Sequence, residues 1–527
     1  MRLLKMCPRG SCKLIWNDRC LTMMSGCTGS SHLVRVHLMT RFAQQSQWPA
    51  VLALAAALGA AGPLSAQDAP KSEKLRATST LDIPKIPYTR YVLPNGLVAL
   101  LNEDHSSPIV YTTVWYHVGS HNEKPGRTGF AHLFEHMMFE GSQNVDAGQH
   151  RIMIQSMGGS FNGSTTEDRT NYYETVPANQ LETALWMESD RMATLLTRLD
   201  QARLDAEREI VKNERRLRVD NQPFGVSSEV MLAALFPQGN PYNWSVIGSM
   251  ADLSAASVED VKDFFRTYYA PNNAVISISG DFKTANAKEM LDKYFGGIPR
   301  GPKITRPTVA HAMLSNEKRL VLEDTRVRLP QLQISWPTVG RDHPDRFALR
   351  ALGSVLTLDR TARLTKALVY DKQLATSVGS FNNSMENTGY FSIFVSPRPN
   401  ASMTDIEHVV DSVLAGVIAA PLSTREVQRF KNYTAVQTVT GLQFTQAKAE
   451  QLADGETMEK SPLSFVTDLT RYSAVTPADV QRVSKRYLSS GRVVLSMVPA
   501  GKLDMAAKPN EPYTNVTPAA ARQGGDK

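Results

Sequence analysis

Short apolar runs rich in β-branched and aromatic residues alternate with longer runs of helical periodicity along most of the chain. Residues 90–102 hold two short runs around Asn95-Gly96, a dipeptide typical of a tight hairpin turn. Ile109–Val118 predicts a third strand, and Ala274–Gly280 predicts a later one. Helical patterns dominate between them, from Phe130 to about Asp220. This alternation suggests an α+β fold.

The alternation repeats after a break near residue 300. Pro302 and Pro307 lie in a stretch with little periodicity, which predicts a linker. Beyond it, the Trp-x-x-Val-Gly pattern of residues 115–119 recurs at residues 336–340, and these few shared letters indicate an internal duplication. The expected order is a linker over 67–84, one unit over 85–300, a linker over 301–312, a second unit over 313–500 and a mobile tail over 501–527.

The first 66 residues differ in composition from the rest. They contain seven Lys and Arg against the single Asp18, so the formal net charge of +7 leaves only +1 for the remainder. A near-neutral body lacks the cationic surface that nucleic-acid backbones require, and we expect no nucleic-acid partner. All four cysteines also lie here, but their spacings do not give the paired CxxC motifs of a four-cysteine zinc site.

Residues 39–66 have the three parts of a secretory signal peptide. A basic start precedes the Ala- and Leu-rich run Pro49–Gly62, and small residues lead to an expected cleavage site near Ala66. The apolar run is too short for a permanent membrane span, which takes roughly twenty residues. We therefore expect an exported protein, periplasmic or extracellular, with residues 1–38 a start-site artefact. The alternatives are a genuine cytoplasmic extension or an uncleaved anchor.

The chemistry centres on the motif His132-Leu-Phe-Glu135-His136, in a run of helix-forming residues without Pro. Two histidines at i and i+4 share one helix face and can bind one ion, and Glu135 lies beside the position of a metal-bound water. This is the inverted form of the zincin motif. Apolar neighbours imply burial, and buried polar groups need partners such as a metal. The alternative is a surface helix with two solvated histidines.

A catalytic zinc site needs a third protein ligand and an open position for water. The predicted helix Asp205–Arg218 offers three glutamates, Glu207, Glu209 and Glu214. Glu207 and Glu214 lie seven residues apart and hence on one face of the helix. The residues alone do not decide between these carboxylates. Ordinary salt bridging along a solvated helix is the alternative for each.

The motif followed by Glu207-Arg-Glu-Ile-Val-Lys-Asn-Glu214 resembles the M16 metallopeptidases, the family of pitrilysin and mitochondrial processing peptidase. The resemblance covers about residues 85–500. It implies two similar α+β units of the LuxS/MPP-like metallohydrolase fold, each a mixed, mainly antiparallel sheet packed by helices, the second without the metal motif. It also implies one Zn²⁺ per chain held by His132, His136 and Glu214, with Glu135 as general base and Glu207 as supporting carboxylate.

Three further segments agree with this family. Residues 241–248 and 268–273 resemble family segments, and residues 158–173 resemble the family's strand that pairs with substrate backbone. Such a strand would add an extended peptide to a sheet edge; an ordinary buried hairpin is the alternative. The residues implied to bind substrate are Asn162, Gly163, Ser164 and Thr165.

One departure from the family concerns an Arg and a Tyr, seven residues apart in the second unit, that stabilise the tetrahedral intermediate. Val369 and Thr376 stand at these positions and supply no such donors. We therefore expect a heterodimer with a homologous subunit that carries the Arg and Tyr, a homodimer being less favoured. The expected function is a zinc-dependent endopeptidase acting on peptides or unfolded polypeptides. The alternative is a peptide-binding or assembly subunit without turnover.

Overall fold

The chain forms two compact units in a computed structural model, Met1–Thr78 and Ser79–Lys527. In the first unit, β1 (Leu14–Asn17) and β2 (Cys20–Met23) pair as an antiparallel hairpin. The predicted signal peptide at 39–66 and linker at 67–84 lie outside the described residues, as does most of 1–38. The structure describes residues 14–17, 20–23, 85–306, 309, 311–489 and 491–517.

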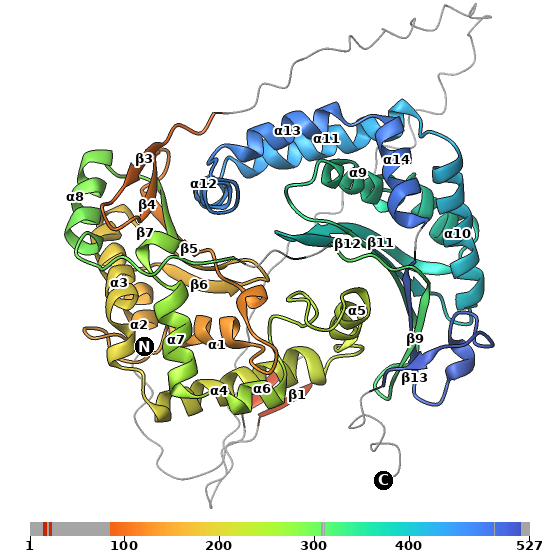
Figure 1. Cartoon of the computed structure of the whole chain (residues 1–527), viewed down its shortest axis with the longest axis horizontal. Helices are drawn as coiled ribbons and strands as arrows, with labels where there is room; N and C mark the ends of the chain where they lie inside the picture. The colour runs from red at the N-terminus through yellow and green to blue at the C-terminus, as the bar shows by residue number, and fades with distance from the viewer. Residues whose placement is uncertain are drawn as a thin grey trace, which may run out of the picture. The chain divides into compact units, whose positions relative to one another are not determined.

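The first sheet of the larger unit has six strands in the order β3-β4-β8-β5-β7-β6 (Figure 1). All neighbours are antiparallel except β4 and β8. The predicted hairpin forms at Asn95-Gly96, where Gly96 has φ 96°. β6 is an edge strand with one described neighbour, β7. The strands are β3 (Thr89–Val92), β4 (Val98–Glu103), β5 (Ile109–Tyr116), β6 (Ser160–Thr165), β7 (Thr170–Pro177) and β8 (Ala274–Gly280).

The second sheet, in the order β14-β9-β13-β10-β12-β11, repeats this topology except at its outer strand, because β14 follows β13 in sequence and pairs with β9 in parallel. As in the first sheet, the second and third strands of this order are parallel and the next three pairs are antiparallel. The fold prediction of two similar units, each with a mixed sheet, is confirmed. The strands are β9 (Lys318–Asp324), β10 (Gln331–Val339), β11 (Ala375–Ser384), β12 (Thr388–Pro397), β13 (Val493–Pro499) and β14 (Thr514–Asn515).

The repeated Trp-x-x-Val-Gly pattern occupies equivalent places. Trp115 lies in β5 and Trp336 in β10, the corresponding strands of the two sheets. A Cβ on Gly119 would come within 2.3 Å of the Thr166 carbonyl oxygen, and one on Gly340 within 2.7 Å of the Glu386 carbonyl oxygen. Each glycine therefore lets the strand end approach the backbone of the hairpin turn that joins the next two strands, which explains why the pattern recurs.

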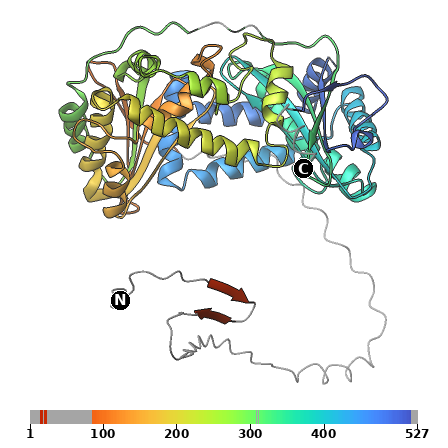
Figure 2. The ribbon, with the colours of Figure 1, turned by 90° about the horizontal axis from the view of Figure 1, so that it is seen from below.

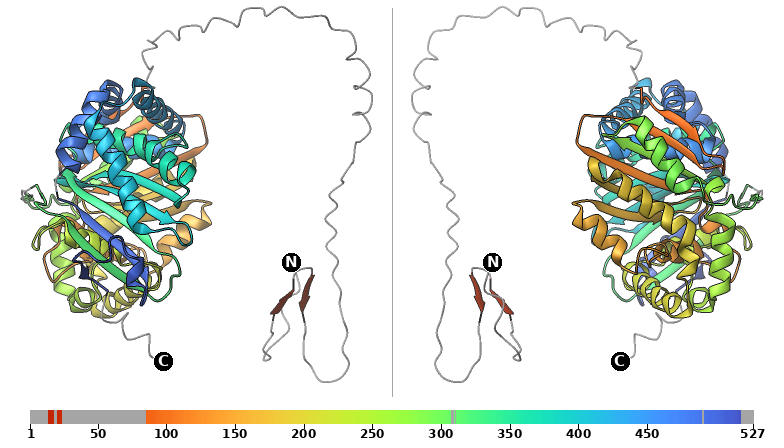
Figure 3. Two further views of the ribbon diagram at one scale, coloured as in Figure 1. Left: turned by 90° about the vertical axis from the view of Figure 1, so that its right-hand side faces the viewer. Right: turned by 90° about the vertical axis from the view of Figure 1, so that its left-hand side faces the viewer.

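Helices pack on each sheet, as the turned views show (Figures 2 and 3). The stretch Phe130–Asp220 is mostly helical as predicted, but the β6–β7 hairpin interrupts it because Ser160–Thr165 and Thr170–Pro177 follow a strand pattern. The helices are α1 (Phe130–Met137), α2 (Gln149–Ser156), α3 (Leu181–Thr194), α4 (Gln201–Arg215), α5 (Ser227–Leu235), α6 (Met250–Ala255), α7 (Val258–Tyr268), α8 (Thr284–Phe295), α9 (Asp345–Thr357), α10 (Met403–Ala419), α11 (Thr424–Gly441), α12 (Thr445–Glu459), α13 (Ser464–Ala474) and α14 (Pro477–Leu488).

The two halves exchange one helix each. α5 follows the first sheet's helices in sequence, but its Met231 and Leu235 pack against Leu322 and Leu495 of the second sheet. Conversely, α12 packs on the first sheet, where Leu452 and its neighbours contact the face that carries Trp115, Leu100 and Val275 (Figure 1). Each half therefore supplies part of the hydrophobic cover of the other, which ties the halves together by buried apolar area.

The end of the chain continues the second half. Ala506 and Ala507 are buried in its core, and β14 adds to β9 in parallel. The tail expected to be mobile from residue 501 is therefore held by core contacts at Ala506 and Ala507 and by the pairing of Thr514–Asn515 with β9. No described helix by itself has the length and hydropathy to cross a bilayer; α10 and α11 meet that criterion only as a pair bent by 102°.

Candidate metal centre

The motif helix α1 begins at a backbone position that only glycine occupies without strain. Gly129 has φ 88°, and a Cβ there would lie 2.7 Å from the Ile247 carbonyl oxygen. The buried Glu123 carboxylate accepts hydrogen bonds from the backbone N–H groups of Gly129 (3.0 Å) and Ala131 (2.8 Å). Trp244 donates to the same carboxylate at 3.0 Å. These contacts satisfy the free N–H groups at the helix start and fix the position of the motif.

Glu123 was missed by the sequence interpretation, and Trp244 was noticed only through the family resemblance. A carboxylate six residues before Gly129 gives no local sign of capping, because the chain must turn back before it reaches the helix. The segment 241–248 now has a physical role, since Gly248 packs directly on Gly129: a Cβ on Gly248 would lie 2.4 Å from the Gly129 nitrogen.

His132, His136 and Glu214 meet at one point, between α1 and the last turn of α4. Their ligand atoms all lie within 4.8 Å of one another. Glu214 Oε2 lies 3.1 Å from His136 Nε2 and 3.8 Å from His132 Nε2. Donors of a tetrahedral zinc lie about 3.4 Å apart when the bonds are about 2.1 Å. The three residues therefore fit a zinc ion in number, donor type and spacing.

Glu207 lies two turns before Glu214 on the same face of α4. It contacts the other side of the His136 ring. Its Oε2 is 3.4 Å from His136 Nδ1, and its side chain is buried. A carboxylate on the second ring nitrogen orients a metal-binding histidine and leaves Nε2 for the metal. Glu207 thus has the position of a supporting carboxylate, and Glu209 pairs instead with Lys212 on the exposed face of α4.

The protonation of the two histidines differs. Burial, helped by the neighbouring His136, lowers the pKa of His132 to about 4, so its ring is neutral at pH 7. Burial alone would lower the pKa of His136 as well, but hydrogen bonds with Glu207 and Glu214 raise it to about 9. A metal must therefore displace a proton from His136, and metal binding releases that proton.

The general-base candidate Glu135 faces the edge strand β6. Thr165 Oγ1 donates to Glu135 Oε2 at 2.6 Å. A Cβ on Gly163 would lie 3.0 Å from Cγ and from Oε1 of Glu135, so this side chain passes directly over the glycine. Burial raises the pKa of Glu135, which moves the carboxylate toward the range useful for accepting a proton.

The four residues predicted to bind substrate lie alternately on the two faces of β6. Gly163 and Thr165 face Glu135. The Ser164 hydroxyl donates to Asn171 Oδ1 at 2.7 Å, and its carbonyl oxygen accepts from Arg169 at 2.8 Å. Asn162 is exposed, and all four lie on an edge strand. The backbone of β6 therefore has the exposure that strand addition requires.

Two other groups of three potential ligands occur among the described residues. In the first, His121 already hydrogen-bonds the Glu167 carbonyl oxygen and Asn122. The second includes Glu188, whose carboxylate is paired with the buried Arg191. Its side chains are at most 4% exposed, against 13–23% for those of the His132 group. Of these three groups of described residues, the His132 group is the one whose convergent ligand atoms are also accessible to a substrate. The remaining members are Asp168 and Glu386 in the first group, and His150 and Glu174 in the second.

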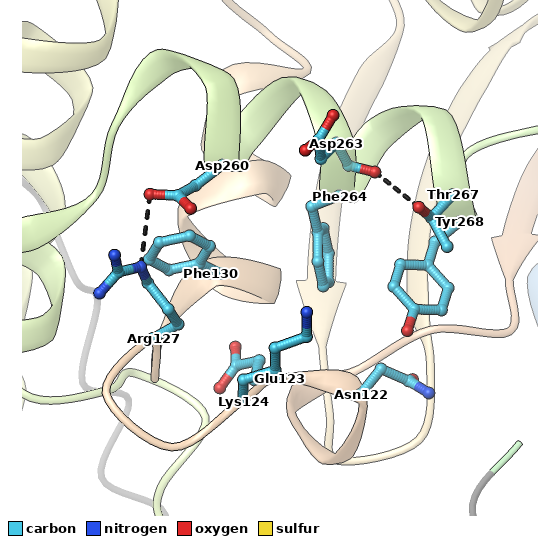
Figure 4. Close-up of a pocket in the computed structure, with 10 residues that line it drawn as sticks. All are labelled: Asn122, Glu123, Lys124, Arg127, Phe130, Asp260, Asp263, Phe264, Thr267 and Tyr268. Atoms are coloured by element: carbon cyan, nitrogen blue, oxygen red, sulfur yellow. Dashed lines mark hydrogen bonds and ion pairs between the residues drawn. The ribbon is translucent and has the colours of Figure 1, made fainter.

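A separate cavity of about 230 Å³ lies beside the start of α1, between Lys124, Phe130 and Phe264 (Figure 4). Figure 4 shows Arg127 paired with Asp260 at its rim, a contact of 3.3 Å. None of the residues that line this cavity belongs to the candidate metal centre.

The positions where the family carries Arg and Tyr lie in the second half. Val369 packs against the core of the second sheet. Thr376 lies on the edge strand β11, is exposed, and donates to the Ser396 carbonyl oxygen at 3.0 Å. Neither provides a cationic or phenolic donor.

Comparison with known proteins places this chain among peptidases. The family model "Insulinase (Peptidase family M16)" matches residues 98–248, and "Peptidase M16 inactive domain" matches residues 255–433. Zinc protease PqqE of Helicobacter pylori is 26% identical over 399 residues, which cover 75% of this chain and 89% of that protein. Mitochondrial-processing peptidase subunit beta of Blastocladiella emersonii is 26% identical over 423 residues, 77% and 87% of the two chains. A solved protease from H. pylori shares the fold, with a TM-score of 0.73, 24% identity, and coverage of 79% of this chain and 100% of that one.

Proposed function

Because this chain belongs to the M16 family of peptidases, we propose that it is a zinc-dependent endopeptidase that hydrolyses peptides or unfolded polypeptides. The observation that carries the proposal is the meeting of His132, His136 and Glu214 beside a base, Glu135, that is held over the edge of β6. Two imidazoles, one carboxylate and an adjacent free carboxylate are the donor set of a hydrolytic zinc site.

The roles of the residues follow from their places. A zinc ion bound by the three ligands would supply a Lewis acid that acidifies water and polarises the scissile carbonyl. Glu135 accepts the proton of the attacking water and delivers it to the leaving amine. Glu207 orients His136 through Nδ1. The edge of β6 positions an extended peptide by backbone hydrogen bonds, so selection by side chain is secondary.

The decisive test is the Glu135→Gln variant. It removes the base and leaves the three ligands, so we expect about one zinc per chain, measured by elemental analysis, and loss of cleavage of a quenched peptide by at least about a hundredfold. If Glu135→Gln cleaves as fast as the unchanged protein, the proposed mechanism is wrong.

The second candidate function is a peptide-binding or assembly subunit without turnover. Val369 and Thr376, which lack the donors that stabilise an oxyanion, favour it. Under this alternative the protein binds zinc and an extended peptide but cleaves nothing, alone or with partners. Zinc content, peptide affinity by fluorescence anisotropy and cleavage rate, measured on one preparation, separate the two functions.

The missing donors also support a heterodimer in which a homologous subunit supplies an Arg and a Tyr. The relative from B. emersonii is named as a subunit, which agrees with a paired arrangement. We expect the purified chain to be nearly inactive and a mixture with the complementary homologue to be active. Equal rates for the single chain and the mixture would contradict this arrangement.

We further propose that the protein is exported and cleaved near Ala66, on the strength of the signal-peptide pattern over 39–66. N-terminal sequencing of the protein recovered from its native host should begin at or near Gln67. Recovery of the protein with residues 39–66 intact from the cytoplasm would contradict export.

A further inference from the structure

A second cavity, of about 470 Å³, lies where the two halves meet. Its wall combines the end of the first sheet at His117 and Asn273, the segment after α8 with Arg300, Lys303 and Arg306, and the end of α12 with Thr457 and Lys460. Among the described residues, no Asp or Glu lines it. The cavity is therefore bounded by four cations from two separate stretches of the chain, residues 300–306 and Lys460, which concentrates positive potential in a concave site.

These four cations are not used in ion pairs. Among the described residues, none of Arg300, Lys303, Arg306 and Lys460 has a carboxylate oxygen within 4.0 Å. Two acids act on these cations through space but contact other groups: Glu386 contacts His117 at 2.8 Å, and Glu456 contacts Arg90 at 2.9 Å. The positive charge facing the cavity is therefore balanced only at a distance.

Two buried donors in the wall have no hydrogen-bond partner among the residues that the structure describes. Arg306 Nη2 donates to the His117 carbonyl oxygen and to Asn273 Oδ1, both at 3.0 Å, which fixes the guanidinium, but its Nη1 is buried and unpartnered. The Thr457 hydroxyl is also unpartnered, in a residue only 2% exposed. A buried donor without an acceptor is costly, and native proteins rarely keep one without a ligand or water. Burial lowers the pKa of Arg306, and the nearby Glu386 and Asp168 oppose this only in part.

We propose that this cavity binds a multiply charged phosphate-type oxyanion. Phosphate groups offer several acceptor oxygens to donors that converge from different directions, which matches Arg306 Nη1, the Thr457 hydroxyl and the Lys460 ammonium. The volume exceeds that of a single phosphate and suits a short polyphosphate chain. Since Arg306 lies in the segment between the halves and Thr457 and Lys460 lie at the end of α12, the bound anion joins these two parts and stabilises their arrangement.

The test uses inorganic triphosphate and the full chain loaded with zinc, at constant ionic strength. Calorimetric titration should show binding, and the melting temperature should rise with triphosphate concentration. Lys460→Met removes one cation from the wall and should weaken binding about tenfold or more. Thr457→Val removes only a hydroxyl and should weaken binding severalfold without changing the charge of the protein.

Matched variants separate a built site from general attraction. Arg360→Met removes the same charge from an exposed turn outside the cavity and should bind triphosphate as the unchanged protein does. Lys460→Arg keeps the cation and should restore binding, which also shows that position 460 tolerates substitution. All of these proteins carry zinc, so any signal from chelation of zinc by triphosphate is common to them.

Three results would overturn the proposal. The first is absence of triphosphate binding by the unchanged protein at millimolar concentration. The second is equal binding by Lys460→Met, Thr457→Val and Arg360→Met, which would mean chelation or diffuse attraction. The third is equally tight binding of citrate, a tricarboxylate, which would mean that charge alone and not phosphate geometry is recognised. None of these readouts depends on peptidase activity.

Discussion

The Thr165 hydroxyl donates a hydrogen bond of 2.6 Å to Oε2 of Glu135, although the two residues lie 30 positions apart, one on the edge strand β6 and the other on α1. The bond joins the strand proposed to hold the peptide to the base proposed to activate water. It fixes one carboxylate oxygen of Glu135 and leaves the other free to accept a proton. Thr165 therefore positions the base, a role different from the substrate contact that the family resemblance implies.

Replacement of Thr165 by Val should impair the chemical step. A hydrogen bond to a charged group contributes about 1.5–3 kcal/mol, so we expect kcat to fall roughly 10- to 100-fold with little change in KM. Thr165→Ser keeps the hydroxyl and should retain most of the activity. Steady-state kinetics on a quenched peptide, with zinc content measured in parallel, checks this. A rise in KM with unchanged kcat would instead assign Thr165 to substrate binding.

Gly163 should tolerate no side chain. A Cβ there would lie 3.0 Å from Cγ and Oε1 of Glu135, closer than carbon atoms pack, so Gly163→Ala should displace the base and lower kcat by about tenfold or more. Gly379→Ala is the matched control, because Gly379 lies on β11, the corresponding edge strand, with open space around it. Equal activity of the two alanine variants would show that Glu135 has room to move.

Glu207 should control zinc affinity and not the proton transfer. Its carboxylate lies 3.4 Å from His136 Nδ1, and loss of such a partner typically weakens metal binding 10- to 100-fold. We expect Glu207→Gln to lose zinc to a competing chelator at correspondingly lower concentration, and to recover activity when zinc is added in excess. Glu209→Gln, two residues away on the exposed face of the same helix, should behave like the unchanged protein. Failure of added zinc to restore Glu207→Gln would indicate a more direct catalytic role.

The histidine pair and the fold class could be predicted because they depend on short-range spacing. Positions i and i+4 meet on any helix, and strand alternation is local, so the structure brings His132 and His136 together as expected. Choice of the third ligand needed the family resemblance, because Glu207 and Glu214 share a helix face and both contact His136. Only the packing of α4 against α1 decides which of the two carboxylates reaches His132.

Other features depend on tertiary packing that no local pattern records. Leu452 and Ala453 of α12 are buried on the sheet of the opposite half, and the mostly polar sequence of this helix does not predict that position. The pleat of β6 places Gly163 and Thr165 on one face, but the sequence does not state that Glu135 lies opposite. The burial of Ala506 and Ala507 has the same origin, since a Pro- and Asn-rich stretch carries little hydrophobic signal of its own.

The stability of the second half should decrease at low pH, because the carboxylate of Glu426 then becomes protonated. This carboxylate lies at the start of α11, where burial is outweighed by hydrogen bonds from Arg363 (2.7 Å) and Ser423 (2.8 Å), which lower its pKa to about 2. A lowered folded-state pKa stabilises the protein above the unfolded-state value near 4.5, and this contribution is lost as the pH falls toward 2. Glu426→Gln should therefore reduce the free energy of unfolding at pH 7 by about 1–3 kcal/mol.

The difference in unfolding free energy between the unchanged protein and Glu426→Gln should shrink by roughly half at pH 3, because the unfolded carboxylate is then protonated while the folded one is still mostly ionised. Urea titrations from pH 7 to pH 3 measure this difference, and loss of zinc at low pH affects both proteins alike. Glu289→Gln, which changes an exposed glutamate with no hydrogen bond or ion pair among the described residues, should show no such difference. A gap between Glu426→Gln and the unchanged protein that stays constant with pH would mean that the Arg363 contact acts through packing and not through charge.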